Sequence, residues 1–379
     1  MKKCIVVSDS FKGTLSSIDI SYICEQTIPK FFPECEVIPI PVADGGEGTV
    51  DCAFAALNAE PITIEVSGPY METLVSTYAI YKDEAIIEMA SCAGLPLVGT
   101  HKDPSLTTTY GVGQMIEDAV MRGCRHIYLG LGGSATNDAG CGCAAALGVR
   151  FYNAEGKPFI PAGATLKNIE HIDISSAQEF LKDVTITAMC DVKNPLFGIK
   201  GAAYIFAPQK GADEQMVRSL DAGLERFNTV LTQDLGIDMA YTPGGGAAGG
   251  FGAGVMALLG GSLVSGIDAI LDLTEFESHL SNCDLVITGE GRLDDQSFSG
   301  KVISGVTSRT MKHGIPVYAI VGNVGNLSSD LAEHGISAVF ETNRNHLPFE
   351  EVIPTAWRDY ELALADALHY RRLIEKRSM

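Results

Sequence analysis

Short apolar runs that end in polar, glycine-rich loops occur at both ends of the chain, and a helical pattern follows each loop. Residues 4–7 and 37–40 form two such runs, and residues 285–288 and 317–321 form two more. Short strands that alternate with helices are typical of a parallel sheet covered by helices. The sequence therefore predicts one α/β domain to which both chain ends contribute strands.

The middle of the chain has a different pattern. Residues 62–66, 74–81 and 85–88 have the alternation of β-ribbon strands, and helical and strand patterns follow them as far as residue 231. The chain has 379 residues, whereas single cores stop growing at ~250–300 residues. We therefore predict two domains: residues 1–70 and 283–379 together, and residues 71–282 as an inserted mixed α/β domain.

The composition excludes several classes of protein. Lys and Arg number 27 against 47 Asp and Glu, which gives a formal net charge of −20. Such a surface repels nucleic acid and anionic lipid, so we expect neither as a partner. The ten cysteines lack the spacing of a zinc site or a disulfide scaffold, which indicates reduced thiols in a cytoplasmic protein. Nothing in the sequence specifies an oligomeric state.

Glycine is concentrated in loops that also carry polar side chains. These loops are residues 9–14, 43–49, 130–142, 190–201, 243–254 and 288–301. Glycine beside polar groups at strand ends favours a backbone that closes on a ligand, often phosphate. In residues 130–138, Ser134, Thr136 and Asn137 add donors to the backbone N–H groups and to the dipole of the helix expected after the loop. The alternative is a tight turn in which Ser134 or Asn137 caps a helix.

Two familiar nucleotide-binding patterns fail on their context. Residues 244–249 have the spacing GxGxxG, but a proline and a polar run precede them where a dinucleotide site requires a strand. A P-loop requires Gly-Lys followed by Ser or Thr, and neither residues 156–158 nor residues 300–302 meet this. We therefore expect any phosphate transfer to proceed without a P-loop.

The charged residues of these loops supply what phosphoryl transfer requires: cations on the phosphates, carboxylates for Mg²⁺ and a base on the attacking hydroxyl. The cations are Lys12, Lys193, Lys210, Arg292 and Lys301. The carboxylates are Asp44, Glu47, Asp191, Glu290, Asp294 and Asp295. Each alone is equally well explained as a solvated charge or a cap, but we expect the set to converge on a cleft between the two domains.

Read in order, the loops resemble the bacterial glycerate kinase family of the first type. The matching segments are residues 9–12 (DSFK), 43–49 (ADGGEGT), 130–138 (GLGGSATND), 190–192 (CDV), 194–196 (NPL), 208–212 (PQKGA), 246–250 (GAAGG) and 287–292 (ITGEGR), then Asp294, Gln296, Gly300 and Lys301. Two positions depart from the family pattern: Ser8 stands where proline or alanine is expected, and Ala139 stands where glycine is expected. Neither is a proposed catalytic side chain.

The resemblance implies a Rossmann-like domain built from both chain ends with a second domain inserted. It also implies ATP-dependent phosphorylation of D-glycerate at the 2-hydroxyl, which gives 2-phosphoglycerate and ADP. The family motifs leave individual roles open, so the following assignments are hypotheses. We expect Asp191 to be the base on the attacking hydroxyl and Arg292 to bind the glycerate carboxylate as a planar fork.

The phosphates and the metal complete the predicted site. Lys12 is expected to contact the phosphates of ATP. The residues expected to bind ATP are Ser10, Gly132, Gly133, Ser134, Thr136, Asn137 and Lys301. Asp44 and Asp294 are expected to place Mg²⁺.

Other functions remain open at this point. They are a glycerate 3-kinase, a kinase of another small hydroxy acid, a nucleotide-sensing protein without turnover, and an NAD-dependent hydroxy-acid dehydrogenase. The number of carboxylates near the expected phosphate loop argues against a sensor, and the failed dinucleotide motif argues against a dehydrogenase.

Overall fold

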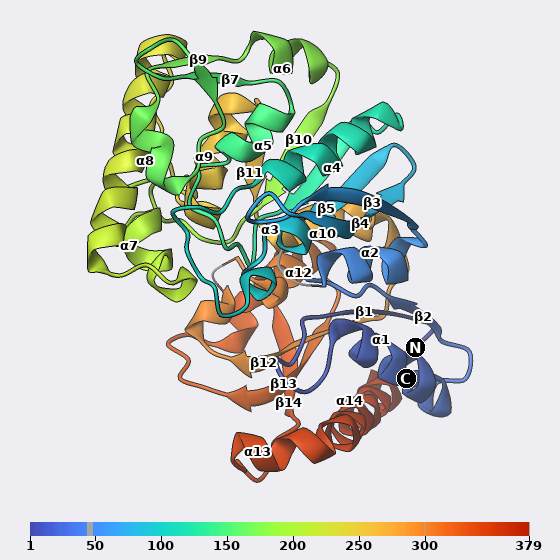
Figure 1. Ribbon diagram of the computed structural model, residues 1–379. Helices are drawn as coiled ribbons and strands as arrows, with labels where there is room; N and C mark the ends of the chain where they lie inside the picture. Colours follow the sequence, from blue (N-terminus) through green and yellow to red (C-terminus); the bar gives the residue numbers. More distant parts are fainter. Residues whose placement is uncertain (44–47, 299, 379) are drawn as a thin grey trace. The chain divides into compact units, whose positions relative to one another are not determined.

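Strands from both ends of the chain form one parallel sheet in the computed structural model, which describes residues 1–43, 48–298 and 300–378. The strand order is β14-β13-β12-β1-β2, and every neighbouring pair is parallel. Figure 1 labels these strands, which are β1 (Lys3–Ser8), β2 (Glu36–Pro39), β12 (Leu285–Leu293), β13 (Val317–Val324) and β14 (Ile336–Glu341). The predicted fold class is confirmed, since β1 pairs with β12 across almost the whole sequence.

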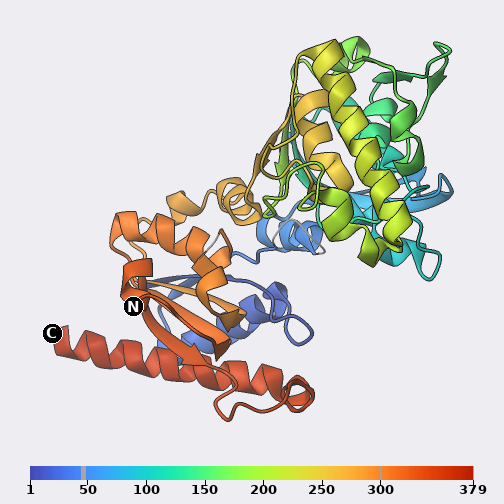
Figure 2. The same ribbon diagram turned by 90° about the vertical axis from the view of Figure 1, so that its left-hand side faces the viewer.

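Helices cover both faces of this sheet. Successive side chains of β13 point to opposite faces, and each face packs against its own helices. Tyr318 and Ile320 pack with residues of α1 and α14, whereas Ala319 and Val321 pack with Ile303 of α12. The helices of this part of the chain are α1 (Ser17–Phe31), α2 (Thr49–Leu57), α10 (Gly266–Leu273), α11 (Phe276–His279), α12 (Val302–Thr310), α13 (Phe349–Val352) and α14 (Ala356–Ser378). Figure 2 shows α14 in red along the strands of this unit.

The start of α1 shows how local sequence determines an element. The Ser16 hydroxyl accepts from the Asp19 N–H at 3.0 Å, and the Asp19 carboxylate accepts from the Ser16 N–H at 2.9 Å. This reciprocal pair satisfies two backbone donors that the first helical turn would otherwise leave open. The spacing of these two residues therefore defines the beginning of the helix.

A second, mixed sheet has the order β11-β10-β6-β5-β4-β3. Its strands are β3 (Glu60–Ser67), β4 (Thr73–Tyr81), β5 (Glu84–Glu88), β6 (His126–Gly130), β10 (Thr185–Met189) and β11 (Ser262–Val264). The ribbon β3-β4-β5 is antiparallel, and β5, β6, β10 and β11 are parallel. A small antiparallel sheet of β7 (Arg150–Tyr152), β8 (Pro158–Phe159) and β9 (His171–Asp173) accompanies it.

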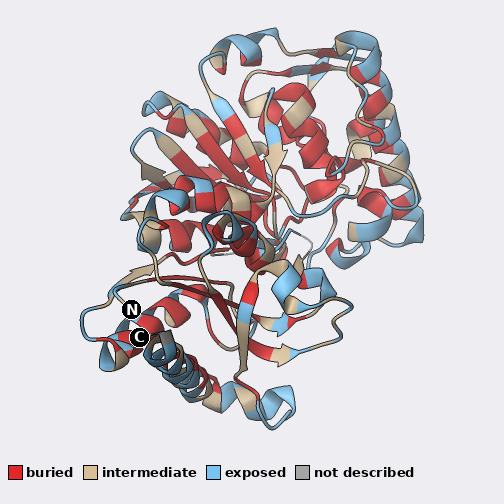
Figure 3. Cartoon of the chain, turned by 180° about the vertical axis from the view of Figure 1, so that it is seen from behind, coloured by how far each residue is buried: buried red, intermediate tan, exposed pale blue. Residues whose placement is uncertain are grey.

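The helices of this part of the chain form its core together with the mixed sheet. They are α3 (Ala90–Ala93), α4 (Tyr110–Met121), α5 (Cys141–Ala146), α6 (Ser175–Phe180), α7 (Ala202–Phe206), α8 (Glu214–Leu235) and α9 (Ala247–Leu258). Figure 3 shows buried residues on the strands and on the inner faces of these helices. The uncharged stretch between Asp238 and Asp268 contains the buried helix α9 and the strand β11. In the described parts of the chain, no helix combines the length and the apolar character required to cross a bilayer.

The chain divides into two compact units at points that precede the predicted domain boundaries. The terminal unit is Met1–Asp44, Asp51–Asn58 and Ser265–Met379, and the inserted unit is Gly45–Val50 and Ala59–Val264. β3 precedes residue 70 but pairs with β4 along its whole length, so it lies in the inserted unit. α10 and α11 precede residue 283 but contact α12, so they lie in the terminal unit.

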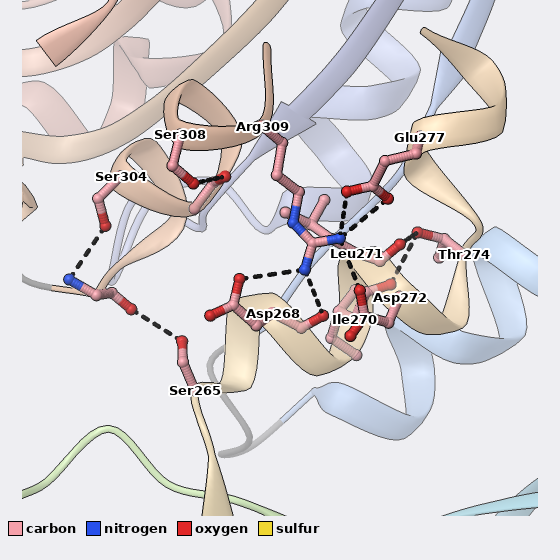
Figure 4. A network of polar contacts seen from close by, with 12 residues as sticks. Ser265, Asp268, Ile270, Leu271, Asp272, Thr274, Glu277, Ser304, Ser308 and Arg309 are labelled. Carbon is pink, nitrogen blue, oxygen red and sulfur yellow. Dashed lines mark hydrogen bonds and ion pairs between the residues drawn. The ribbon is translucent and has the colours of Figure 1, made fainter. Parts of the chain in front are cut away.

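A polar network joins α10 and α11 to α12. Figure 4 shows the Arg309 guanidinium among three carboxylates, and it donates to Asp268, Asp272 and Glu277 at 3.2, 2.7 and 2.8 Å. Arg309 is 11% exposed, while its partners are at least half exposed. Each such pair contributes at most ~1 kcal/mol alone. Three pairs on one guanidinium nevertheless tie α10 and α11 to the helix that begins next to Lys301.

Candidate active site

The loops that follow β1 and β12 lie side by side at one edge of the terminal sheet. The parallel register pairs Ser8 with Gly289, and the Asp9 N–H donates to the Gly289 carbonyl at 2.9 Å. The carboxyl ends of parallel strands are where α/β sheets bind ligands. The loop that carries Ser10 and the exposed Lys12 is therefore a neighbour of the segment that carries Arg292.

Glu290 is the buried carboxylate at this edge. Its side chain is 6% exposed, and its Oε1 has no hydrogen-bond partner among the described residues. Burial raises the pKa of Glu290, while the Ser297 hydroxyl and the charge of Lys301 act in the opposite direction. The Thr288 hydroxyl, fully buried two residues earlier, also has no partner in the described structure. In the sequence, Glu290 stood out only as one of several strand-end carboxylates.

Arg292 and Asp294 form an ion pair at the end of β12. The Arg292 Nε lies 3.4 Å from the Asp294 Oδ2, and the Arg292 side chain is 68% exposed. The Asp294 Oδ1 accepts from the Gln296 N–H at 3.0 Å. Lys301 is exposed and occupies the N-cap position of α12. Five predicted residues therefore belong to the carboxyl edge of the terminal sheet: Ser10, Lys12, Arg292, Asp294 and Lys301.

Asp294 is the described residue that was predicted to hold Mg²⁺. No cluster of three or more His, Cys, Asp or Glu side chains suited to a metal ion occurs within them. Mg²⁺ typically binds through one or two carboxylates together with phosphates and water, so Asp294 with a bound nucleotide fits this ion. Asp44, the other predicted metal ligand, lies outside the described residues.

The predicted residues of the inserted unit also share one edge of its sheet. The parallel register pairs Gly130 with Met189, and the Leu131 N–H donates to the Met189 carbonyl at 3.3 Å. The loop after β6 is therefore adjacent to the loop after β10, which carries the exposed Asp191. The structure thus brings Asp191 to the same sheet edge as residues 132–137.

The loop after β6 is anchored by Asp138, whose carboxylate is completely buried. It accepts from the Thr109 N–H and hydroxyl at 2.8 Å each, and from the N–H groups of Gly140 and Gly142 at 3.2 Å each. Burial raises the pKa of Asp138, and these hydrogen bonds act to lower it. The carboxylate therefore holds the loop against the beginning of α4.

Two side chains of this loop carry buried polar atoms without partners. Thr136 and Asn137 are fully buried, and the described chain offers no hydrogen bond to the Thr136 hydroxyl or to either polar atom of the Asn137 amide. An unpaired buried polar group costs about 1–3 kcal/mol, and native proteins contain few of them. A ligand with phosphate oxygens would satisfy the hydroxyl and the amide N–H₂, so these residues fit a nucleotide.

The backbone of the loop is only partly available to an anion. Gly132 is half-buried and Gly133 is exposed. The N–H groups of Ala135 and Ala139 already donate to the carbonyls of Ala93 and Gly249. The expected helix dipole is also weaker than predicted, since α5 has six residues and begins beyond Asp138. The loop therefore presents its side chains and the Gly132-Gly133 turn to an anion, and not the end of a helix.

Several residues that shape this loop were given no specific role in the predicted site, although Lys210 was among the cations expected near phosphates. Lys210 donates to the Ser134 hydroxyl and the Thr136 carbonyl. A Cβ on Gly249 would lie 2.1 Å from the Thr136 carbonyl oxygen, so only glycine fits there. Ala139 adopts a left-handed φ of 54°, which explains why glycine suits this position in the family pattern. The sequence signals for Lys210 and Gly249 were the motifs at residues 208–212 and 246–250.

Comparison with known proteins identifies the family of the chain. The profile of the "Glycerate kinase family" matches residues 4–370. A glycerate kinase from Bacillus cereus is 45% identical over 363 residues, which is 95% of each chain. A glycerate 2-kinase from Escherichia coli K12 is 42% identical over 341 residues, 89% of this chain and 90% of the relative. A crystal structure proposed to be glycerate kinase 2 from Salmonella typhimurium LT2 superimposes with a TM-score of 0.88 at 36% identity, covering 99% of both chains.

The α/β fold and these relatives define a phosphotransferase that acts on a hydroxyl group. The chain belongs to the glycerate kinase family. The family resemblance predicted from the loops is therefore confirmed.

The Asp138 anchor leads to a stability prediction. Asp138→Asn should lower the free energy of unfolding by roughly 2–4 kcal/mol, because an amide places N–H donors where the donors of Thr109, Gly140 and Gly142 already converge. Urea denaturation followed by circular dichroism measures the change. Asp83→Asn, an exposed turn position, serves as the matched control and should change stability little. Equal stability of the two variants would contradict the anchoring role.

Proposed function

We propose that this protein transfers the γ-phosphoryl group of ATP to the 2-hydroxyl of D-glycerate, giving 2-phospho-D-glycerate and ADP. The observation that carries the proposal is the 42% identity to the Escherichia coli glycerate 2-kinase over 89% of the chain. The buried, unpartnered atoms of Thr136 and Asn137 support a ligand rich in oxygen acceptors at the same loop.

The proposed reaction is a single in-line displacement. The glycerate 2-hydroxyl oxygen forms a bond to the γ-phosphorus, the bond from that phosphorus to the bridging oxygen of ADP breaks, and the hydroxyl proton passes to Asp191. A general base of this kind typically contributes 10²–10⁴-fold to a rate. Asp191 suits the task because it is exposed on the loop directly after β10, beside the proposed phosphate loop.

The remaining predicted residues bind and orient the substrates. Ser10, Lys12 and Lys301 are assigned to ATP phosphates, together with Gly132, Gly133, Ser134, Thr136 and Asn137. Arg292 is assigned to the glycerate carboxylate, for which its planar fork and high exposure are suited. Asp294 would hold Mg²⁺, which neutralises charge on the phosphates when bound. When ADP is measured directly, by chromatography, leaving out Mg²⁺ should abolish its formation.

The proposed function is tested by product identity. The protein is incubated with Mg-ATP and D-glycerate, and ADP release is measured. The phosphorylated product is then assayed with enolase alone or with enolase and phosphoglycerate mutase. Enolase consumes only 2-phosphoglycerate, so a signal with enolase alone is expected. A signal that requires the mutase would indicate a 3-kinase. Glycerate-independent ADP, or none, would contradict a glycerate kinase and direct the search to other hydroxy acids.

The role of Asp191 is tested by an isosteric substitution. Asp191→Asn should lower kcat by ~10²–10⁴ while KM for both substrates changes little, because only proton acceptance is lost. Steady-state kinetics in the coupled assay measures this. Asp183→Asn, also an exposed carboxylate of the inserted unit, should behave as the wild type. Near-normal turnover of Asp191→Asn would remove Asp191 from the role of base.

The role of Arg292 is tested by comparing how a substitution changes KM for glycerate and KM for ATP. Arg292→Lys keeps the charge but loses the bidentate geometry, so KM for glycerate should rise by about tenfold or more, with much less change in KM for ATP. Arg122→Lys, which alters an exposed helical ion pair, is the control. An equal rise in both KM values would assign Arg292 to the phosphates.

A further inference from the structure

Lys210 is a buried lysine beneath the loop that follows β6. It ends the short 3-10 turn Pro208–Lys210 between α7 and α8, and its side chain is 2% exposed. Its Nζ donates to the Ser134 Oγ at 2.7 Å and to the Thr136 carbonyl at 2.6 Å. Lysine is almost never fully buried unless it is paired. Here its two bonded partners are a hydroxyl and a carbonyl rather than a carboxylate.

We propose that Lys210 is a positioning residue that aims the donors of this loop at an anion, an inference that rests on the proposed binding of ATP phosphates by residues 132–137. The Ser134 oxygen accepts a hydrogen bond from the Lys210 ammonium, so the Ser134 O–H points away from the lysine. The same ammonium holds the Thr136 carbonyl. Because C=O and N–H point in opposite directions across a trans peptide, the Asn137 N–H is also directed away.

The surroundings leave the Thr136 peptide little freedom to turn. Gly249 approaches the Thr136 carbonyl so closely that a Cβ would lie 2.1 Å from its oxygen. On the other side, Asp138 is bonded to Thr109, Gly140 and Gly142. Thr107 also donates to the Ala135 carbonyl at 2.9 Å. With the backbone held from these directions, the lysine acts on a loop of defined shape.

The charge of Lys210 gives this arrangement a measurable signature. Burial lowers the pKa of Lys210 to about 7, and the nearby Asp138 carboxylate acts in the opposite direction. Among the described residues that pack on the lysine from the β6 loop, α7 and α8, Asp138 is the charged group that acts on it. The ammonium is therefore present below about pH 7 and is lost as the pH rises through that value. Affinity for an anion should fall in the same direction.

Sulfate tests this inference because it is tetrahedral, doubly charged and does not titrate near neutral pH. Its binding to the whole protein is measured by isothermal titration calorimetry from about pH 6 to about pH 9. The wild type should lose about tenfold or more in affinity across this range. Lys210→Met should bind weakly at every pH. Lys182→Met, an exposed lysine of the same unit, should retain the wild-type profile.

The outcomes separate this inference from the proposed function. A flat wild-type profile overturns the role of Lys210 even if the product assay shows glycerate phosphorylation, and this measurement needs no variant that might misfold. A Lys210→Met protein that keeps the wild-type profile overturns it as well. A protein that shows the expected pH dependence for sulfate but forms no ADP from ATP and glycerate would retain the anion site and lose the proposed activity.

For a folded Lys210→Met variant, kinetics adds a second readout. KM for ATP should rise by about tenfold, while KM for glycerate should change much less, because the lysine is argued to act on phosphate donors alone. Loss of stability without this split between the two substrates would indicate a purely structural lysine and would contradict the proposal.

Discussion

The Asp138 carboxylate is the interaction on which the candidate phosphate loop depends. A fully buried carboxylate is tolerated only when hydrogen bonds replace its hydration, and here two bonds come from Thr109 and two from glycine N–H groups that follow. These bonds connect the loop after β6, the start of α4 and the start of α5. Because the carboxylate binds these three segments, Thr136 and Asn137 are held in a buried position that their own hydrogen bonds do not explain.

The sheet edges could be predicted from the sequence, and the contacts beneath them could not. Apolar runs at residues 4–7 and 285–288 indicated parallel strands, and parallel strands place Lys12 and Arg292 at one edge. The capping box of α1 is local in the same sense, because Ser16 and Asp19 are only three residues apart. Lys210 meets Ser134 across 76 residues. No local pattern encodes such a pairing, so its burial was found only in the structure.

The division of the chain shows the same limit. The pairing of β3 with β4 follows from a hairpin that spans the predicted boundary at residue 70. The attachment of α10 and α11 depends on Arg309, more than 30 residues further along the chain. Glu290 likewise looked like any other strand-end carboxylate until its burial distinguished it. The positions of strands and the starts of helices follow from local sequence patterns, whereas burial and pairing depend on the assembled fold.

The central claim is that residues 132–137 bind the phosphates of ATP, and a crystal structure of the protein with ADP and Mg²⁺ tests it most directly. We expect a phosphate oxygen within hydrogen-bond distance of the Asn137 side-chain amide, with the Ser134 hydroxyl donating to the same group. ADP bound elsewhere, with the Asn137 amide still without a partner, would contradict the claim.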